Sequence, residues 1–200
     1  MNPQVHRQRG YTAVELMIAI GIFGIGVTGI IAMQKVTVVS NQHAKNLGIA
    51  THIAQSWLDM LANDAVMWNH PSATNAVPDI GQTTWLQSVK SNANAAGDWF
   101  LPVYSNPLAF GPAFDALGNP VNPTTTTPVA FCSHLRLSWL YQPTVSGNGL
   151  IRAEVRVFWL RDGRAFSQDM CATAQVANVG GATHTFHFVQ KITGIRENTL

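Results

Sequence analysis

The chain has one long apolar run near its N-terminus, at residues 16–33. None of these side chains is charged, and Thr28 is the only polar one. At about 1.5 Å of rise per residue, a helix over this run is roughly 27 Å long, close to the roughly 30 Å hydrocarbon core of a bilayer. The run therefore predicts a single membrane-spanning helix.

Two other interpretations of this run fit less well. A core helix of a globular protein is rarely apolar on every face for five turns. The apolar region of a secretory signal peptide spans roughly 7–15 residues and ends at a small-x-small cleavage site. Here the run is longer, and the sequence after it continues with a helical pattern.

Beyond residue 33, apolar positions recur every three or four residues, which is typical of an amphipathic helix. The predicted apolar face carries Val36, Val39, His43, Leu47, Ala50, Ala54, Trp57 and Leu61. We therefore expect one helix over residues 11–64, with the membrane span at about 16–33 and the remainder packed on a head domain. His43, on that face, is expected to be partly buried and not a ligand.

Residues 65–200 are long enough for one modest head domain. Alternating apolar and polar positions predict antiparallel strands in 134–142, 151–167 and 184–193, with a hairpin turn at Asp162-Gly163. In the second strand, Arg152, Glu154 and Arg156 are predicted on one face and the apolar residues on the other. Prolines make 106–128 a predicted loop, and 83–97 is a predicted short helix. The predicted fold class is α+β, a long helix packed on a small antiparallel sheet.

A single carboxylate, Glu15, directly precedes the apolar run. An acid in a membrane helix costs up to about 2.5–3.5 kcal/mol, so it is a candidate functional residue whose partner must be identified. No cation lies within helical reach on its C-terminal side, where Lys35 is the first. The cations before it, Arg7 and Arg9, favour a cytoplasmic N-terminus, which places the rest of the chain outside the cytoplasm.

The segment RGYTAVELMIAIGIF resembles the N-terminal signature of type IV prepilins and pseudopilins. Members of that family have a short basic leader ending in glycine, an aromatic residue or Met after the cut, an acid at the fifth mature position and an apolar helix. Here the glycine is Gly10, the aromatic residue is Tyr11 and the acid is Glu15. Tyr11 stands where the family usually has Phe, and the mid-helix proline of many major pilins is missing.

The resemblance implies a processed subunit. Residues 1–10 would be a leader that prepilin peptidase removes, and the new α-amine of Tyr11 would be N-methylated. Glu15 would pair with that amine on a neighbouring subunit, so the partners would be other pilins, joined through their N-terminal helices. The protein would cross the inner membrane once, with residues 65–200 in the periplasm, before entering a pilus or pseudopilus.

Small residues form a stripe within the apolar run. Gly21, Gly24, Thr28 and Ala32 are spaced three or four apart, so they share one helix face, where close helix packing is expected. A chance arrangement of small residues remains the alternative. Residues 24–29 also satisfy the G-x-G-x-x-G pattern, but no strand precedes them and they lie inside an apolar helix, which excludes the dinucleotide-binding interpretation.

Cys132 and Cys171 are the two cysteines of the chain. In an oxidising periplasm they are candidates for a disulfide bond, and two buried free thiols are the alternative.

Charged residues make up 11% of the chain. There are 12 Lys and Arg against 10 Asp and Glu, and loss of the leader with Arg7 and Arg9 leaves equal numbers. This balance predicts no nucleic-acid partner. No motif of a hydrolase, a zinc protease or a P-loop is present, so we expect no enzyme activity, no cofactor and no metal. His184 and His187 would lie on opposite faces of a strand, which argues against a shared metal.

Within the family, the exit from the apolar run resembles that of minor pilins. The matching positions are Gly26, Gly29, Ala32, Met33 and Gln34, followed by Asp59, Met60 and Asn63. A minor pilin that assembles or initiates a type IV pilus, near its tip, is therefore the predicted function. A minor pseudopilin of type II secretion shares the same features, and an anchored periplasmic binding protein that never polymerises is a third possibility.

Overall fold

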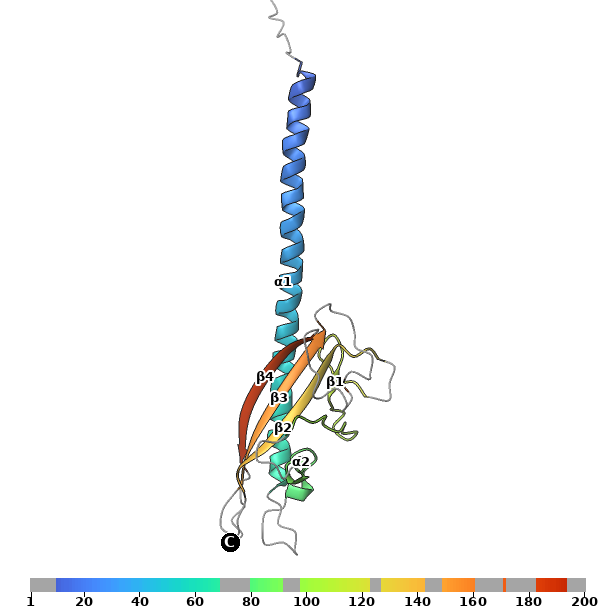
Figure 1. Cartoon of the computed structure of the whole chain (residues 1–200). Helices are drawn as coiled ribbons and strands as arrows, with labels where there is room; N and C mark the ends of the chain where they lie inside the picture. The colour runs from blue at the N-terminus through green and yellow to red at the C-terminus, as the bar shows by residue number, and fades with distance from the viewer. Residues whose placement is uncertain are drawn as a thin grey trace, which may run out of the picture. The chain divides into compact units, whose positions relative to one another are not determined.

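The computed structural model describes residues 10–68, 80–91, 98–122, 127–142, 149–160, 171 and 183–193. In chain order the elements are helix α1 (Ala13–Met67), the 3-10 helix η1 (Ile80–Gln82), helix α2 (Ser88–Ser91) and strands β1 (Ala113–Phe114), β2 (Phe131–Tyr141), β3 (Leu150–Leu160) and β4 (Thr183–Thr193) (Figure 1). The chain forms two compact units, Met1–Asn46 and Leu47–Leu200. The boundary lies inside α1, and each unit is described by itself.

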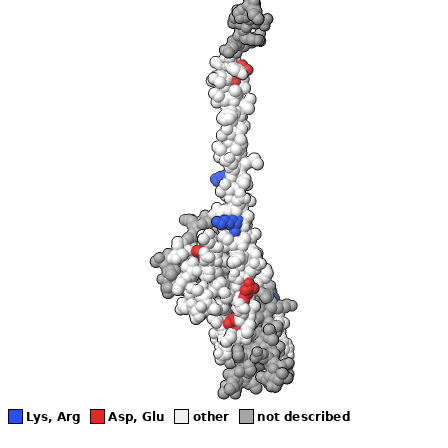
Figure 2. Space-filling model, turned by 180° about the vertical axis from the view of Figure 1, so that it is seen from behind, with Lys and Arg blue, Asp and Glu red and all other residues white. Residues whose placement is uncertain are grey.

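The part of α1 in the first unit exposes its apolar side chains. Ile25 is 77% exposed, and Met17 and Met33 are each 74% exposed. Figure 2 shows a nearly uncharged surface there, with one acidic group at the first turn. Among the described residues, α1 is the one helix long and apolar enough to cross a membrane.

The second unit contains a four-stranded antiparallel sheet in the order β1-β2-β3-β4. β2 and β3 pair from Cys132 opposite Phe158 to Tyr141 opposite Leu150, with one irregularity near Tyr141. β3 pairs with β4 over all eleven residues of each strand. The α+β, pilin-like architecture predicted from the sequence, a long helix and a small antiparallel sheet, is thereby confirmed.

The helical part of the second unit buries one face in the head core. The buried residues recur at helical spacing, and they are Ala50, Ile53, Ala54, Trp57, Leu58, Leu61, Asp64 and Ala65. The predicted face was wrong at its beginning, because Val36, Val39, His43 and Leu47 are exposed. The periodicity identified the apolar side of the helix correctly, but burial begins only where the head offers covering side chains.

Aromatic rings fill the core between this helix and the chain before β2. The Trp57 ring meets Trp85 edge-on at 5.4 Å and Phe110 at 4.7 Å between centroids, and Phe110 meets Phe114 at 5.6 Å. The indole N–H of Trp57 donates to the hydroxyl of Ser133 on β2 at 2.6 Å. A hydrogen bond therefore fixes the helix to the sheet at one position, while the aromatic packing is less directional.

Two predictions for the head need correction. The predicted loop 106–128 contains β1, whose Ala113 and Phe114 pair with Cys132 and Phe131. Its neighbour Pro112 directly precedes this short edge strand, a position where proline is tolerated. Of the predicted helix 83–97, the structure describes only α2 as α-helical, and residues 92–97 lie outside the described part. The predicted hairpin turn at Asp162-Gly163 also lies outside it.

Asp64 is a buried carboxylate near the end of α1, only 7% exposed. Its Oδ1 accepts the backbone N–H of Thr84 at 2.6 Å, and its Oδ2 accepts those of Trp85 and Leu86 at 2.8 and 3.0 Å. An acid in the last turn of a helix faces the negative end of the helix dipole, which is unfavourable. Three charge-assisted hydrogen bonds offset this cost and attach the 84–86 turn to α1.

A disulfide bond joins Cys132 on β2 to Cys171. Their Cα atoms are 5.6 Å apart, the two residues are 39 positions apart in sequence, and both are buried. The sequence left open a disulfide bond or two buried free thiols, and the structure contains the disulfide bond.

We predict that Asp64→Ala destabilises the head strongly. The change leaves three backbone donors without their acceptor, at about 1–3 kcal/mol for each one that stays buried, so a loss of about 3 kcal/mol or more is expected. Urea unfolding followed by tryptophan fluorescence measures it. Asp59→Ala, at an exposed position of the same helix, is the matched control and should change stability by less than about 0.5 kcal/mol. Equal effects of the two substitutions would contradict the role of Asp64.

We predict that a Cys132→Ser, Cys171→Ser double variant still enters the membrane but has a less stable head. Closing a loop of this length contributes about 4 kcal/mol in the chain-entropy description of disulfides. The head should therefore be degraded faster in cells, which pulse-chase immunoblotting measures. Labelling of the native protein with a thiol reagent after denaturation without reductant tests the bond itself, and two reactive thiols would refute it.

Candidate functional site

The first turn of α1 begins at a threonine cap. The backbone N–H of Glu15 donates to the hydroxyl of Thr12 at 3.3 Å, and that of Leu16 donates to the Thr12 carbonyl at 3.2 Å. Threonine is a favoured N-cap residue because its side-chain oxygen satisfies an otherwise unpaired N–H. Gly10 and Tyr11 precede the cap, lie outside the helix and are exposed, Tyr11 by 86%.

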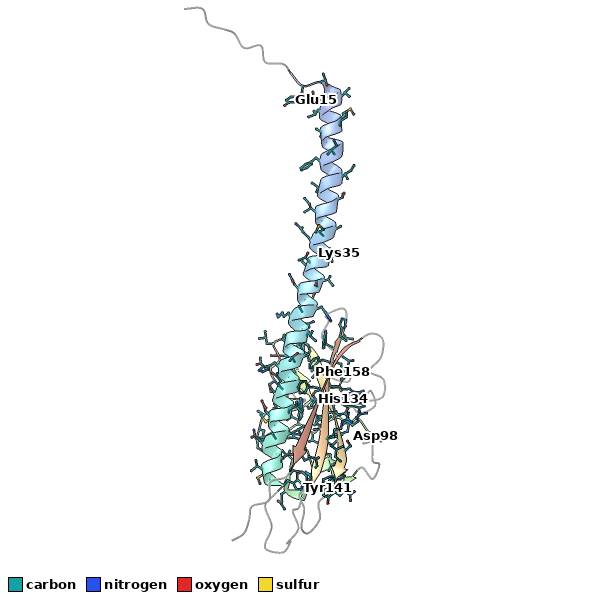
Figure 3. All side chains as sticks on the ribbon, turned by 90° about the vertical axis from the view of Figure 1, so that its left-hand side faces the viewer. Glu15, Lys35, Asp98, His134, Tyr141 and Phe158 are labelled. Atoms are coloured by element: carbon teal, nitrogen blue, oxygen red, sulfur yellow. A yellow bond between two sulfur atoms is a disulfide. The ribbon has the colours of Figure 1, made fainter. Side chains whose placement is uncertain are left out.

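Glu15 is the third residue of α1, and it is exposed among apolar neighbours. In the described part of the chain it takes part in no ion pair; the two ion pairs there both lie in the sheet. Figure 3 shows Glu15 at the first turn and Lys35 far along the same helix. Twenty residues of helix separate them, about 30 Å at 1.5 Å per residue, so Lys35 cannot neutralise Glu15 within the chain.

The predicted packing stripe lies on the exposed part of α1. A methyl group added at Gly21 or Gly24 would meet no atom within 4 Å, so this helix surface is open to a partner. The Thr28 hydroxyl donates to the Ile25 carbonyl of its own helix at 2.9 Å and therefore needs no partner in an apolar environment. A role of Gly21, Gly24, Thr28 and Ala32 in helix packing stays a prediction.

Arginines also gather on the face of the sheet opposite its buried Leu135 and Val155 side chains. The sequence analysis placed Arg152 and Arg156 on one face of their strand, but it did not identify Arg136 beside them. Arg136 on β2 and Arg152 on β3 both form ion pairs with Glu154, Arg152 Nε at 2.9 Å from Oε1. Arg156 donates through Nε to His134 Nδ1 at 3.1 Å. We call Arg136, Arg152 and Arg156, together with the flanking Trp99, the arginine face. The alternation of His134, Arg136 and Ser138 along β2 was the signal that could have shown it.

Trp99 covers two members of the arginine face. The guanidinium carbons of Arg156 and Arg136 lie 4.5 and 4.9 Å from the centroid of its indole ring. Trp99 is held in place by its neighbour Phe100, which exchanges two backbone hydrogen bonds of 2.8 and 3.0 Å with Leu135 of β2. Cation–π contacts of this kind contribute about 0.5–2 kcal/mol each.

Burial and neighbouring positive charge lower the pKa values of two residues at the arginine face, Arg156 and His134. Burial lowers the pKa of Arg156, and the nearby charge of Arg136 lowers it further. Burial, and then the charge of Arg156, lowers the pKa of His134 to about 3. His134 is therefore neutral at physiological pH. Because its Nδ1 accepts from Arg156, the ring hydrogen belongs on Nε2.

The described residues contain no group of three or more His, Cys, Asp or Glu side chains that could hold a metal ion. His184 lies against Trp159, with 5.5 Å between ring centroids. The start of α1 brings a glycine, Gly10, an exposed aromatic residue, Tyr11, and an acid, Glu15, together within six residues.

The comparison with known families agrees with the start of α1. The family model described as "Prokaryotic N-terminal methylation motif" matches residues 5–31, which include Gly10, Tyr11, Glu15 and much of the apolar run. No curated protein and no solved structure matches the chain. The motif and the apolar helix fit a membrane-anchored, single-pass protein. The match supports a type IV pilin or pseudopilin, a structural subunit that prepilin peptidase processes and that assembles with other pilins.

Proposed function

We propose that this protein is a minor pilin, a structural and assembly subunit of a type IV pilus that acts in the complex initiating the filament at its tip. Residues 1–10 are removed as the leader, residues 11–64 form the membrane-spanning and packing helix, and residues 65–200 form a periplasmic head. Among minor pilins, the exit from the apolar run is most like that of PilV. The supports are the methylation motif, the exposed apolar helix and the α+β head.

One observation carries the proposal: Glu15 stands at the start of an apolar helix with no cation in reach along that helix. In a bilayer this carboxylate costs free energy until a positive group approaches. The α-amine of a neighbouring subunit, freed by cleavage after Gly10, is a cation that the same processing step creates. Glu15 and the Tyr11 amine of the next subunit therefore form an intermolecular pair, which is strong in an apolar environment once both ions are placed.

The exposed surface of α1 supports the same conclusion. Apolar side chains such as Ile25 and Met33 need lipid before assembly and other helices after it. A glycine-containing stripe would let those helices approach closely. The helix therefore serves first as an anchor and then as a packing element in the filament.

Intact-mass and N-terminal analysis of the mature protein tests the proposal directly. A chain that begins at Tyr11 and carries one additional methyl group is expected. A mature protein that retains Met1 would instead support an anchored periplasmic protein. Co-purification with pilus subunits, as opposed to components of type II secretion, separates a minor pilin from a minor pseudopilin.

We predict that Glu15→Ala inserts into the membrane normally but enters filaments poorly. Insertion depends on the apolar run, which the change leaves intact, whereas assembly loses the partner of the neighbouring amine. Immunoblots of sheared filaments and of membranes measure the two pools. Thr37→Ala is the matched control, because it removes a polar group of the same helix whose hydrogen bond, to the Met33 carbonyl, is internal. Normal incorporation of Glu15→Ala would refute the assembly role.

We predict that Gly10→Val blocks cleavage. The peptidase must bring the backbone on both sides of the cut close to its catalytic groups, and a glycine without Cβ permits that approach. The variant should accumulate in the membrane as a form longer by the ten leader residues, which mass spectrometry or gel mobility detects. Gly48→Ala, at an exposed position further along α1, should be cleaved normally. Normal processing of Gly10→Val would count against cleavage at this glycine.

A further inference from the structure

Helix α1 contains a short stretch, VTVVSN at residues 36–41, in which every residue is a poor helix former. Its valines and its threonine lose side-chain freedom against the preceding turn, and Ser40 and Asn41 compete with the helix for backbone hydrogen bonds. Each such residue lowers the helix equilibrium about threefold relative to alanine, so the whole stretch lowers it by on the order of a few hundredfold. We call residues 36–41 the valine segment.

No described part of the head covers the valine segment. All of its residues are exposed, Val36 by 70%, Val38 by 65% and Val39 by 61%. Packing of α1 against the head core begins only at about Ile49. Most of the stability of a helix in a protein comes from tertiary packing, so the valine segment lacks the support that α1 receives further along.

The apolar run on the other side of the valine segment ends at Met33. Within a bilayer a helix cannot open, because released backbone groups would find no water to bind. The glycines of the run, such as Gly24, are therefore held helical by lipid although glycine is an even poorer helix former. The valine segment lies beyond the run, where water can bind the released N–H and C=O groups. It is thus held neither by lipid nor by the head.

Interactions along the helix do not compensate for this weakness. The Thr37 hydroxyl donates to the Met33 carbonyl of its own helix at 2.9 Å, a back-bond that slightly destabilises a helix and often bends it. Between Glu15 and Asp59 the sequence contains no acid. Lys35 and Lys45 therefore have no acidic partner one turn away, of the kind that stabilises exposed helices.

We propose that the valine segment is a hinge, at which α1 opens locally so that the membrane anchor and the head move as two bodies. The two compact units of the chain meet between Asn46 and Leu47, close to this segment. Reforming a helix after an internal break requires a new nucleus, which keeps the open form a minor state of roughly 0.1–10%. Opening lengthens each residue from about 1.5 Å to at most about 3.4 Å, which gives the head roughly 10 Å more reach.

A hinge at this position serves any anchored head that has to find a partner. A head on a rigid rod samples little of its surroundings, whereas a head on a hinge turns toward a neighbouring protein while its anchor stays in lipid. The hinge goes beyond the function proposed above, because it requires neither cleavage after Gly10 nor assembly into a filament. It holds equally for a pilin and for an anchored protein that never polymerises.

Hydrogen–deuterium exchange followed by mass spectrometry tests the hinge, with the full chain held in a lipid nanodisc. Each helical N–H binds the carbonyl four residues earlier, so opening of the valine segment exposes the amides of residues 36–45. These amides should exchange at least about tenfold faster than those of residues 50–65, and also faster than those of residues 16–33. A fast stretch between two slow ones distinguishes a hinge from fraying, which starts at a helix end.

Matched variants connect the exchange rate to helix propensity. Val36→Ala, Val38→Ala and Val39→Ala together should slow the exchange of residues 36–45 about twentyfold, since each change favours the helix by a factor of about 2.7. His52→Ala with Asn63→Ala is the control. Both residues are exposed on the part of α1 that packs on the head, so comparable gains in propensity there should leave the exchange of residues 36–45 unchanged.

Three outcomes would overturn the proposal. Exchange of residues 36–45 as slow as that of residues 50–65 would show that α1 does not open at the valine segment. An unchanged rate in the triple alanine variant would remove low helix propensity as the cause of opening. Equal slowing by the triple variant and by the control would show that the opening extends over the whole helix, so that no hinge exists.

Discussion

The apolar half of α1 is the constraint on which the rest of this protein depends. Its large side chains, such as Ile25 and Met33, are more than two-thirds exposed in the single chain, so lipid or other helices must cover them. The head has to fold without help from that surface, and it does so around the last six turns of the same helix. Its aromatic core, its disulfide and the hydrogen bond from Trp57 to Ser133 all lie within the second unit.

The sequence was informative wherever structure follows from a local pattern. The apolar run and the alternating strands predicted α1, β2, β3 and β4, because apolar positions repeat with a different period in a helix and in a strand. The pattern could not show where burial begins, so Val36 and His43 were placed on the packed face of the helix, although packing against the head core begins at about Ile49. β1 was missed because the prolines around it dominate the local signal, while its role is to bring Phe114 into the core.

The two candidate sites also differ in whether they follow from a local sequence pattern or from the fold. Gly10, Tyr11 and Glu15 are recognisable because processing reads a continuous segment, so all the necessary residues are adjacent in sequence. The arginine face depends instead on the register of two strands, which places Arg136 opposite Glu154. A shift of one residue would move every side chain of β2 to the other side of the sheet. Composition and motif spacing carry no information on that register, so the sequence placed Arg152 and Arg156 on one strand face but could not show that Arg136 joins them.

Three carboxylates of this chain differ in the groups that compensate their charge. Asp64 is satisfied by three backbone N–H groups of the 84–86 turn, so its partners belong to its own domain. Glu154 is satisfied by two arginines of its own sheet. Glu15 has neither solution: the backbone around it is helical, and the next cation along the helix is about 30 Å away. Asp64 and Glu154 have partners within their own domain and Glu15 has none along its helix, which is the physical reason for proposing Glu15 as an intermolecular contact.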